Sequence, residues 1–216
     1  MPAERRREHF GAGALSLDPA TSVFLNCPYD PEYLSLFDAA VLATACCGFT
    51  PRSALESGTV AEPRMTRITR AIFKSKYSIH DLTRCTGEGD ANLARFNMPL
   101  ELGIAMARRY LARRGADRHD WLVMVPTGHP YGRFISDLAG FDPVTHNGSD
   151  RGLVVAVMTW LATRVDSAGT LSPQQVLKGL PEFRRELRRL RKTWGQSPPS
   201  ADVVLAAFKI AKQLGR

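Results

Sequence analysis

The 216-residue chain has few cysteines, and their positions match no functional spacing. The four are Cys27, Cys46, Cys47 and Cys85, with no Cys-x-x-Cys pair and no histidine spacing typical of a zinc site. We therefore predict reduced thiols, mostly in the core, and no metal site. A chain of this length can bury a substantial core without disulfide bonds.

Long apolar segments are also lacking. Residues 1–20 are charged and then small and polar, so they contain neither the apolar stretch of a signal peptide nor a membrane span. We predict a flexible N-terminal segment over residues 1–20, a cytoplasmic location and no membrane partner.

Acidic residues are outnumbered, 21 against 29 lysines and arginines, which gives a formal charge of +8. Clustered basic residues favour nucleic-acid binding. Much of the excess, however, lies at residues 5–7, 113–114 and 184–192, which are typical of solvated helix faces and ends and follow no recognition-helix pattern. We predict no dedicated nucleic-acid binding, although a basic protein could equally attract a phosphorylated small molecule.

Three common enzyme motifs are missing as well. No Gly-x-Gly-x-x-Gly follows the first apolar run, and the chain has no Walker sequence and no Gly-x-Ser-x-Gly nucleophile elbow. The sequence thus gives no support to a dinucleotide-dependent dehydrogenase, a P-loop nucleotidase or a serine hydrolase of the α/β type.

Apolar runs alternate with helical patterns along most of the chain. We predict strands within residues 22–30, 49–56, 77–82, 121–126 and 142–146, and helices within 31–48, over 64–74, 97–111 and 133–139, and after an N-cap at Asp150. This alternation predicts an α/β domain over residues 21–166: a flavodoxin-like parallel sheet of order 2-1-3-4-5 with helices on both faces. In the helix over 97–111 we expect Leu100, Ile104, Ala107 and Leu111 to face inward.

The composition changes after Asp166, where a Ser-, Gly- and Pro-containing linker precedes two amphipathic segments. Apolar residues at 176, 180, 183, 187 and 190 form a helical seam, and a second helical pattern covers 202–214. We predict a C-terminal helical hairpin over residues 173–216 that either covers the core or builds a dimer, with a homo-oligomer through these helices as the expected assembly.

In an open parallel sheet, ligands bind beyond the carboxyl ends of the strands where the winding reverses, here between the first and third strands. The side chains expected there are Asn26, Cys27, Pro28, Tyr29 and Asp30 from the first loop, His80, Asp81 and Arg84 from the third, and Arg95, Asn97 and Glu101 from the segment that follows.

Asp81 and Glu101 are the candidate catalytic pair, because two neighbouring carboxyl groups can serve as acid, base or nucleophile. Asp81 could instead accept loop N–H groups, and Glu101 could stabilise the positive end of its helix. We favour function for Glu101, because a carboxylate in an otherwise apolar segment needs a reason. Gly103 beside it indicates either the close approach of a ligand or strand, or tight helix packing.

His80 and three arginines also lie near this edge of the predicted sheet. Adjacent strand residues point to opposite faces, so we interpret His80 as a core or supporting histidine. Arg52, Arg64 and Arg67 could meet a phosphate group, or be solvated, or pair with Glu56 and Glu62.

Four segments carry a family resemblance: VFLNCPYD at 23–30, GFTPRSALE at 48–56, YSIHDLTR at 77–84 and RFNMPLELGIA at 95–105. Together they resemble bacterial TIR-like proteins, which are related in fold to nucleoside 2-deoxyribosyltransferases, over about the first 165 residues. The resemblance implies a flavodoxin-like sheet and a glutamate, Glu101, that attacks or stabilises the ribosyl carbon of an N-glycosidic bond. It implies that Asp81 holds a sugar hydroxyl or assists the base, and that the substrate is a nucleoside, a nucleotide or NAD.

The chain departs from these families just before the glutamate. Arg95, Phe96 and Asn97 stand where the transferases have Asp-x-Gly, and Asn97 replaces the aromatic residue that precedes the TIR glutamate by four positions. Asn97 could hydrogen-bond a ribose hydroxyl. Two main hypotheses follow: an enzyme that cleaves or transfers an N-glycosidic bond through Glu101, with NAD or a nucleoside as substrate and no cofactor, or a non-catalytic nucleotide sensor or self-association module of bacterial defence signalling. A third is a scaffold in which the acidic residues only cap loops.

Overall fold

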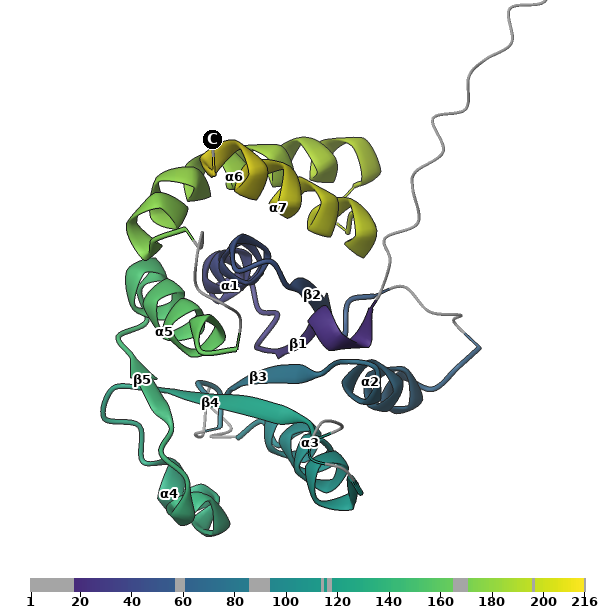
Figure 1. Cartoon of the computed structure of the whole chain (residues 1–216), viewed down its shortest axis with the longest axis vertical. Helices are drawn as coiled ribbons and strands as arrows, with labels where there is room; N and C mark the ends of the chain where they lie inside the picture. The colour runs from purple at the N-terminus through teal and green to yellow at the C-terminus, as the bar shows by residue number, and fades with distance from the viewer. Residues whose placement is uncertain are drawn as a thin grey trace, which may run out of the picture.

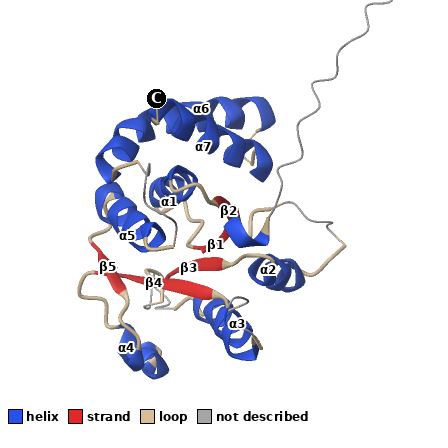
Figure 2. Ribbon diagram, in the orientation of Figure 1, coloured by secondary structure: helices blue, strands red, loops and turns tan. Residues whose placement is uncertain are grey.

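A parallel sheet of five strands, in the order β2-β1-β3-β4-β5, forms the centre of the protein (Figures 1 and 2). The computed structural model describes residues 18–56, 61–85, 94–113, 115, 118–164, 171–195 and 197–215. The strands are β1 Ser22–Asn26, β2 Thr50–Ser53, β3 Tyr77–Asp81, β4 Asp120–Pro126 and β5 Val144–His146. The flavodoxin-like fold and the strand order predicted from the sequence are therefore confirmed.

Helices cover both faces of this sheet. They are α1 Leu34–Cys46, α2 Arg64–Phe73, α3 Asn97–Leu111, α4 Tyr131–Phe134, α5 Asp150–Ala162, α6 Pro173–Trp194 and α7 Ser200–Leu214. Helices α1 and α5 lie on one face and α2 and α3 on the other, as Figure 1 shows. Strand β1 is consequently buried along its whole length: Val23 and Leu25 face α1, while Phe24 packs among α2 and α3.

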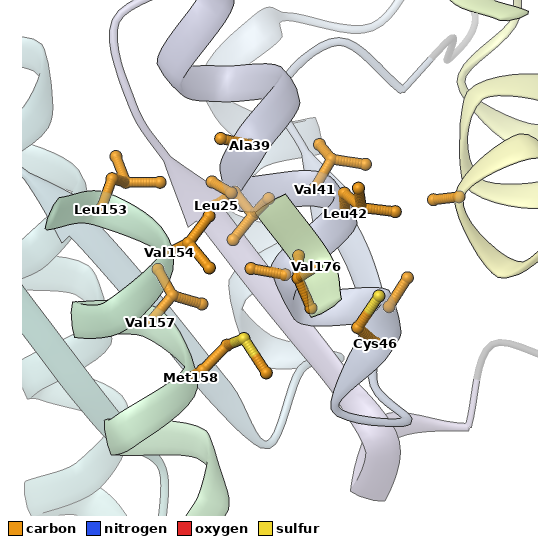
Figure 3. Close-up of a cluster of buried hydrophobic side chains, with 14 of the residues drawn as sticks. Leu25, Ala39, Val41, Leu42, Cys46, Leu153, Val154, Val157, Met158 and Val176 are labelled. Atoms are coloured by element: carbon orange, nitrogen blue, oxygen red, sulfur yellow. The ribbon is translucent and has the colours of Figure 1, made fainter. Parts of the chain in front are cut away.

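The C-terminal helices α6 and α7 form a further layer over α1 (Figure 1). The seam residues Val176, Leu180, Phe183 and Leu187 belong to the same core cluster as Leu25, and Figure 3 shows Val176 among the side chains of α1 and α5. Helix α1 is thus enclosed by the sheet and by α6 and α7, which explains why every residue from Phe37 to Cys46 is buried and most of them are apolar.

This packing bears on the two roles expected for the C-terminal helices. The seam covers the core of its own chain, so a homo-oligomer through these helices would need another of their surfaces, and it stays a prediction. The predicted flexible segment 1–20 falls mostly outside the described residues. Among those residues, no helix has both the length and the apolar character needed to cross a bilayer.

Two details of the helices differ from the prediction. The N-cap of α5 is Ser149, whose hydroxyl accepts the Gly152 N–H at 3.1 Å, and Asp150 is the first helical residue. Asp150 instead binds Arg184 of α6 at 2.7 Å and so ties the two helices together. The helix expected over 133–139 is a single turn, Tyr131–Phe134, followed by a separate 3-10 turn, Ser136–Gly140.

The inward face of α3 is the third difference. Leu100 and Leu111 are 54% and 75% exposed, whereas Met98, Glu101, Leu102 and Ala105 are buried. The expected inward face started at Leu100 and consisted of apolar residues alone. The same three-and-four spacing also starts at Met98, and the fold uses this second face, which carries a carboxylate into the protein.

Candidate functional site

The predicted site lies where β1 and β3 end and α3 begins. Asn26, the last residue of β1, donates its side-chain amide to Met98 O at 2.9 Å, and the same nitrogen lies 2.8 Å from His80 Nδ1. These contacts join the end of β1 to β3 and to the first turn of α3. The Asn26 amide nitrogen thereby positions the start of α3, and contact of this residue with a ligand stays a prediction.

His80 continues this contact into a buried polar chain. Its Nε2 lies 2.7 Å from Ser78 Oγ, which lies 2.7 Å from Nε2 of His119. Burial lowers the pKa of His80 to about 3 and that of His119 to about 4, so both rings are neutral at physiological pH. Since the Asn26 nitrogen is a donor, His80 Nδ1 accepts and its Nε2–H donates to Ser78. The interpretation of His80 as a core histidine agrees with this position.

Asp81, at the end of β3, is fully buried, and four donors reach its carboxylate. Tyr33 Oη and His146 Nε2, the latter at 3.1 Å, contact Oδ2, while the backbone N–H of Thr83 at 2.9 Å and its hydroxyl contact Oδ1. The Gly148 N–H donates to His146 Nδ1 at 3.2 Å, so Nδ1 accepts and the Nε2–H donates to Asp81. The carboxylate is thus held in place by the loop after β3, as the alternative interpretation of this residue expected.

Tyr33, Thr83 and His146 are the polar partners that the sequence did not reveal. His146 ends β5, which was recognised as a possible strand, and Tyr33 and Thr83 follow β1 and β3. All three therefore obey the rule that placed the site at the carboxyl ends of the strands. Applying this rule to every strand end, rather than to β1 and β3 alone, would have included His146.

Glu101 differs from Asp81 in its surroundings. It lies in the second turn of α3, is 4% exposed, and receives no hydrogen bond from the described part of the chain. Burial raises the pKa of its carboxyl group to about 7, and the charge of Arg64, at the start of α2, opposes this change. Near neutral pH the group is therefore present in both its acid and its ionised form.

The pKa shifts of Cys27 and Tyr29 indicate that the carboxyl groups of Asp81 and Glu101 lie in one region of the protein. Burial, followed by the charge of Asp81, raises the pKa of the Cys27 thiol, and Glu101 adds to the effect. Burial, Cys27 and Glu101 likewise raise the pKa of Tyr29. Cys27 thus lies within the electrostatic reach of both carboxyl groups, and both the thiol and the phenol are neutral at physiological pH.

The charged residues of the predicted site form its rim. Asp30 lies 2.6 Å from Arg95 Nη1 and 3.3 Å from Arg84 Nε, and Arg84 also binds Glu32 at 2.7 Å. The backbone N–H of Arg95 donates to Arg84 O at 3.0 Å. The rim therefore joins the loops after β1 and β3.

Two further residues of the predicted site, Pro28 and Asn97, differ in burial. Pro28 is buried, and Asn97 is exposed at the start of α3. A Cβ atom added to Gly103 would meet no described atom within 4 Å, so neither tight helix packing nor a close strand explains this glycine, and the approach of a ligand stays a prediction. Part of the predicted loop after β3, residues 86–93, lies outside the described residues.

A pocket of about 370 Å³ lies on the α1 face, where the C-terminal helices meet α1 and the end of β2. Its wall includes Tyr29 from the site and the pair Asp38 and Arg191, whose charged atoms are 3.6 Å apart. Burial raises the pKa of Asp38 to about 6, against the opposing charge of Arg191. Among its described residues this pocket therefore combines apolar side chains with two arginines, Arg52 and Arg191, and one titratable acid.

Across the described residues, no three His, Cys, Asp or Glu side chains gather into a set that could hold a metal ion. Comparison of the chain with protein-family models, curated proteins and solved structures found no match.

Proposed function

We propose that the protein binds a nucleoside, a nucleotide or NAD at the carboxyl end of its sheet and cleaves or transfers the N-glycosidic bond through Glu101. The observation that carries this proposal is Glu101, a residue that is only 4% exposed and whose carboxyl group no described residue hydrogen-bonds. Buried polar groups are nearly always paired in folded proteins. A buried carboxyl group with a raised pKa and no partner is typical of a functional position.

The chemistry follows from the charge that develops when a glycosidic bond breaks. The bond between the ribosyl carbon and the base nitrogen breaks, its electron pair goes to the base, and the sugar becomes positively charged. An ionised Glu101 would stabilise this charge or bond to the carbon, and water or an acceptor base would then complete the reaction. Because the reaction needs the ionised carboxylate, its rate should rise with pH through about 7.

Asp81 receives a different role in this proposal from the one implied by the family resemblance. Both of its oxygens already accept hydrogen bonds, from Tyr33 and His146 on one side and from Thr83 on the other. A sugar hydroxyl would have to compete with these donors. We therefore assign Asp81 to positioning the loop that follows β3, next to the ligand.

The second candidate function is a non-catalytic sensor of a nucleotide. The pocket of about 370 Å³ favours it, because helices α6 and α7 and the α/β core share its wall. A ligand in that pocket would contact Tyr29 as well as α7, so binding could change how the C-terminal helices pack. In this version Glu101 would contribute to binding but not to bond cleavage.

Chromatographic turnover of NAD and a mixed nucleoside and nucleotide panel tests the enzyme proposal. The wild type, Glu101→Gln and the control Glu182→Gln, an exposed position on α6, are compared at equal and high concentration. Release of free base or nicotinamide by the wild type and the control, with at least a hundredfold loss in Glu101→Gln, is expected. No release by any of the three would contradict the enzyme. A ligand that then raises the melting temperature without being consumed would support the sensor.

A further inference from the structure

A second, smaller pocket of about 130 Å³ lies between β2 and α2. Three arginines, Arg52, Arg67 and Arg70, and one acid, Glu56, contribute its charged side chains. We call it the Arg52–Arg67 pocket. None of the described residues in its wall belongs to the set expected from the sequence to surround Glu101.

Arg52 points into this pocket from the sheet. Its neighbour across the ladder is Phe24, which packs against α2, so the Arg52 side chain lies on the same face of the sheet. Nε and Nη2 of Arg52 bind the Glu56 carboxylate at 2.8 and 2.5 Å. The third nitrogen, Nη1, is buried, and no described residue accepts a hydrogen bond from it. The side chain as a whole is only 8% exposed.

Arg67 repeats this situation from the helix side. Its Nε atom is buried in the same way and also has no acceptor among the described residues. A buried donor on a guanidinium group is costly to leave without an acceptor. Both arginines line one small pocket and each carries one such donor, so an oxyanion bound there would supply acceptors, because guanidinium groups match the geometry of phosphate oxygens.

The charge balance of the wall also favours an anion. Among the described residues of the wall, Glu56 is the only acid against three arginines, and Arg70 is partly neutralised by Glu62, which it binds just before α2. The Glu56 carboxylate reduces the attraction for an anion but leaves a positive excess, mainly at Arg67. A pocket of this volume suits a single phosphoryl group rather than a whole nucleotide.

The Arg52–Arg67 pocket adjoins the Glu101 site. Ala54 lies in its wall and donates its backbone N–H to Tyr29 Oη at 3.2 Å. Ile68, also in the wall, packs in the same cluster as Ala105, which lies one turn after Glu101 on α3. A phosphoryl group bound here would therefore sit beside a ligand that reaches Glu101.

We propose that the Arg52–Arg67 pocket binds a phosphoryl group, and that the ligand of the Glu101 site is consequently a nucleotide rather than an unphosphorylated nucleoside. The first half depends only on the pocket. The second half rests on the proposed function of Glu101.

Calorimetric titration with inorganic phosphate tests the first half, in a buffer without other oxyanions and at constant low salt. Arg67→Gln should weaken phosphate binding at least tenfold, whereas the control Arg133→Gln, an exposed arginine on α4 far from α2 in Figure 1, should leave it unchanged. Glu56→Gln should strengthen binding severalfold, because it removes the one negative charge from the wall. If the wild type and Arg67→Gln bind phosphate with equal affinity, the proposal that this pocket binds phosphate is wrong. If Arg67→Gln does not fold, a phosphate affinity of Glu56→Gln equal to that of the wild type overturns the proposal instead.

Titration of Glu101→Gln with AMP, adenosine and inorganic phosphate tests the second half without turnover. AMP should bind at least tenfold more tightly than either adenosine or phosphate, and Arg67→Gln introduced into this variant should remove most of the difference from adenosine. Equal affinities for AMP and adenosine, or phosphate binding without AMP binding, would overturn the nucleotide assignment and leave the phosphate pocket standing. Tight AMP binding together with no base release by the wild type would contradict only the proposed enzymatic activity and would leave the nucleotide assignment standing.

Discussion

Replacing Glu101 by glutamine should change how the stability of the protein depends on pH. Burial raises the pKa of this carboxyl group from 4.5 to about 7 in the folded protein. Between these two values the unfolded chain carries the negative charge while the folded protein keeps the proton. The favourable contribution of this group is therefore fully present below pH 4.5 and is lost as the pH rises through 7. Glutamine carries no charge at any pH and removes this dependence.

The size of the effect follows from the same pair of values. At about 1.4 kcal/mol for each pH unit, the difference between 4.5 and about 7 corresponds to roughly 3 kcal/mol. Because Glu101 is 4% exposed, solvent screening reduces this figure little. The free energy of unfolding of Glu101→Gln, minus that of the wild type, should thus rise by about 3 kcal/mol between pH 4 and pH 8. Asp38, whose pKa is also raised, titrates in both proteins and cancels in the difference.

Urea denaturation followed by circular dichroism, at half-unit steps from pH 4 to pH 8, measures this difference. Glu182→Gln, an exposed position on α6, should give a flat difference and controls for the loss of one carboxylate. A constant difference between Glu101→Gln and the wild type, within about 1 kcal/mol, would refute the reasoning. It would mean that Glu101 ionises in the folded protein much as it does in the unfolded chain.

Three further predictions concern packing and hydrogen bonds, and urea denaturation at pH 7 measures each of them. Leu102→Ala should lower the free energy of unfolding by about 2–5 kcal/mol, whereas Leu100→Ala should change it by less than about 0.5 kcal/mol, because only Leu102 faces the core. Phe183→Ala should cost about 3–5 kcal/mol, because α6 completes the core over α1. Tyr33→Phe should cost about 1–3 kcal/mol, because it removes a donor from the buried Asp81 carboxylate.

Matched substitutions at exposed positions serve as controls for the last two. Phe134→Ala on α4 and Tyr110→Phe on α3 should both be close to neutral, since these side chains are 46% and 68% exposed. Equal effects of Leu100→Ala and Leu102→Ala would mean that α3 is rotated relative to the described structure. A neutral Phe183→Ala would mean that α6 does not pack on the core in solution, and a neutral Tyr33→Phe would argue against the contact with Asp81.

The location of the candidate site was predictable from the sequence, because the site lies at the carboxyl ends of the predicted strands. Asn26, Asp81 and Glu101 were expected together because the carboxyl ends of parallel strands share one edge, and the structure places them there. The use of each side chain was not predictable in the same way. Two of the donors that occupy Asp81, Tyr33 and His146, come from segments distant in the sequence, and the sequence around Asp81 is the same whether or not such donors reach it.

The sequence by itself determined the order and type of the elements and the parallel sheet. Local periodicity, buried apolar strands and turn residues such as Gly48, whose φ is 81° at the end of α1, act over a few residues and are visible without the fold. Only the tertiary structure decided which face of α3 turns inward, that the seam of α6 packs on α1, and that Arg52 and Arg67 meet across β2 and α2. The physical reason is that a helical period fits more than one face, whereas long-range packing selects the single face that fills the core.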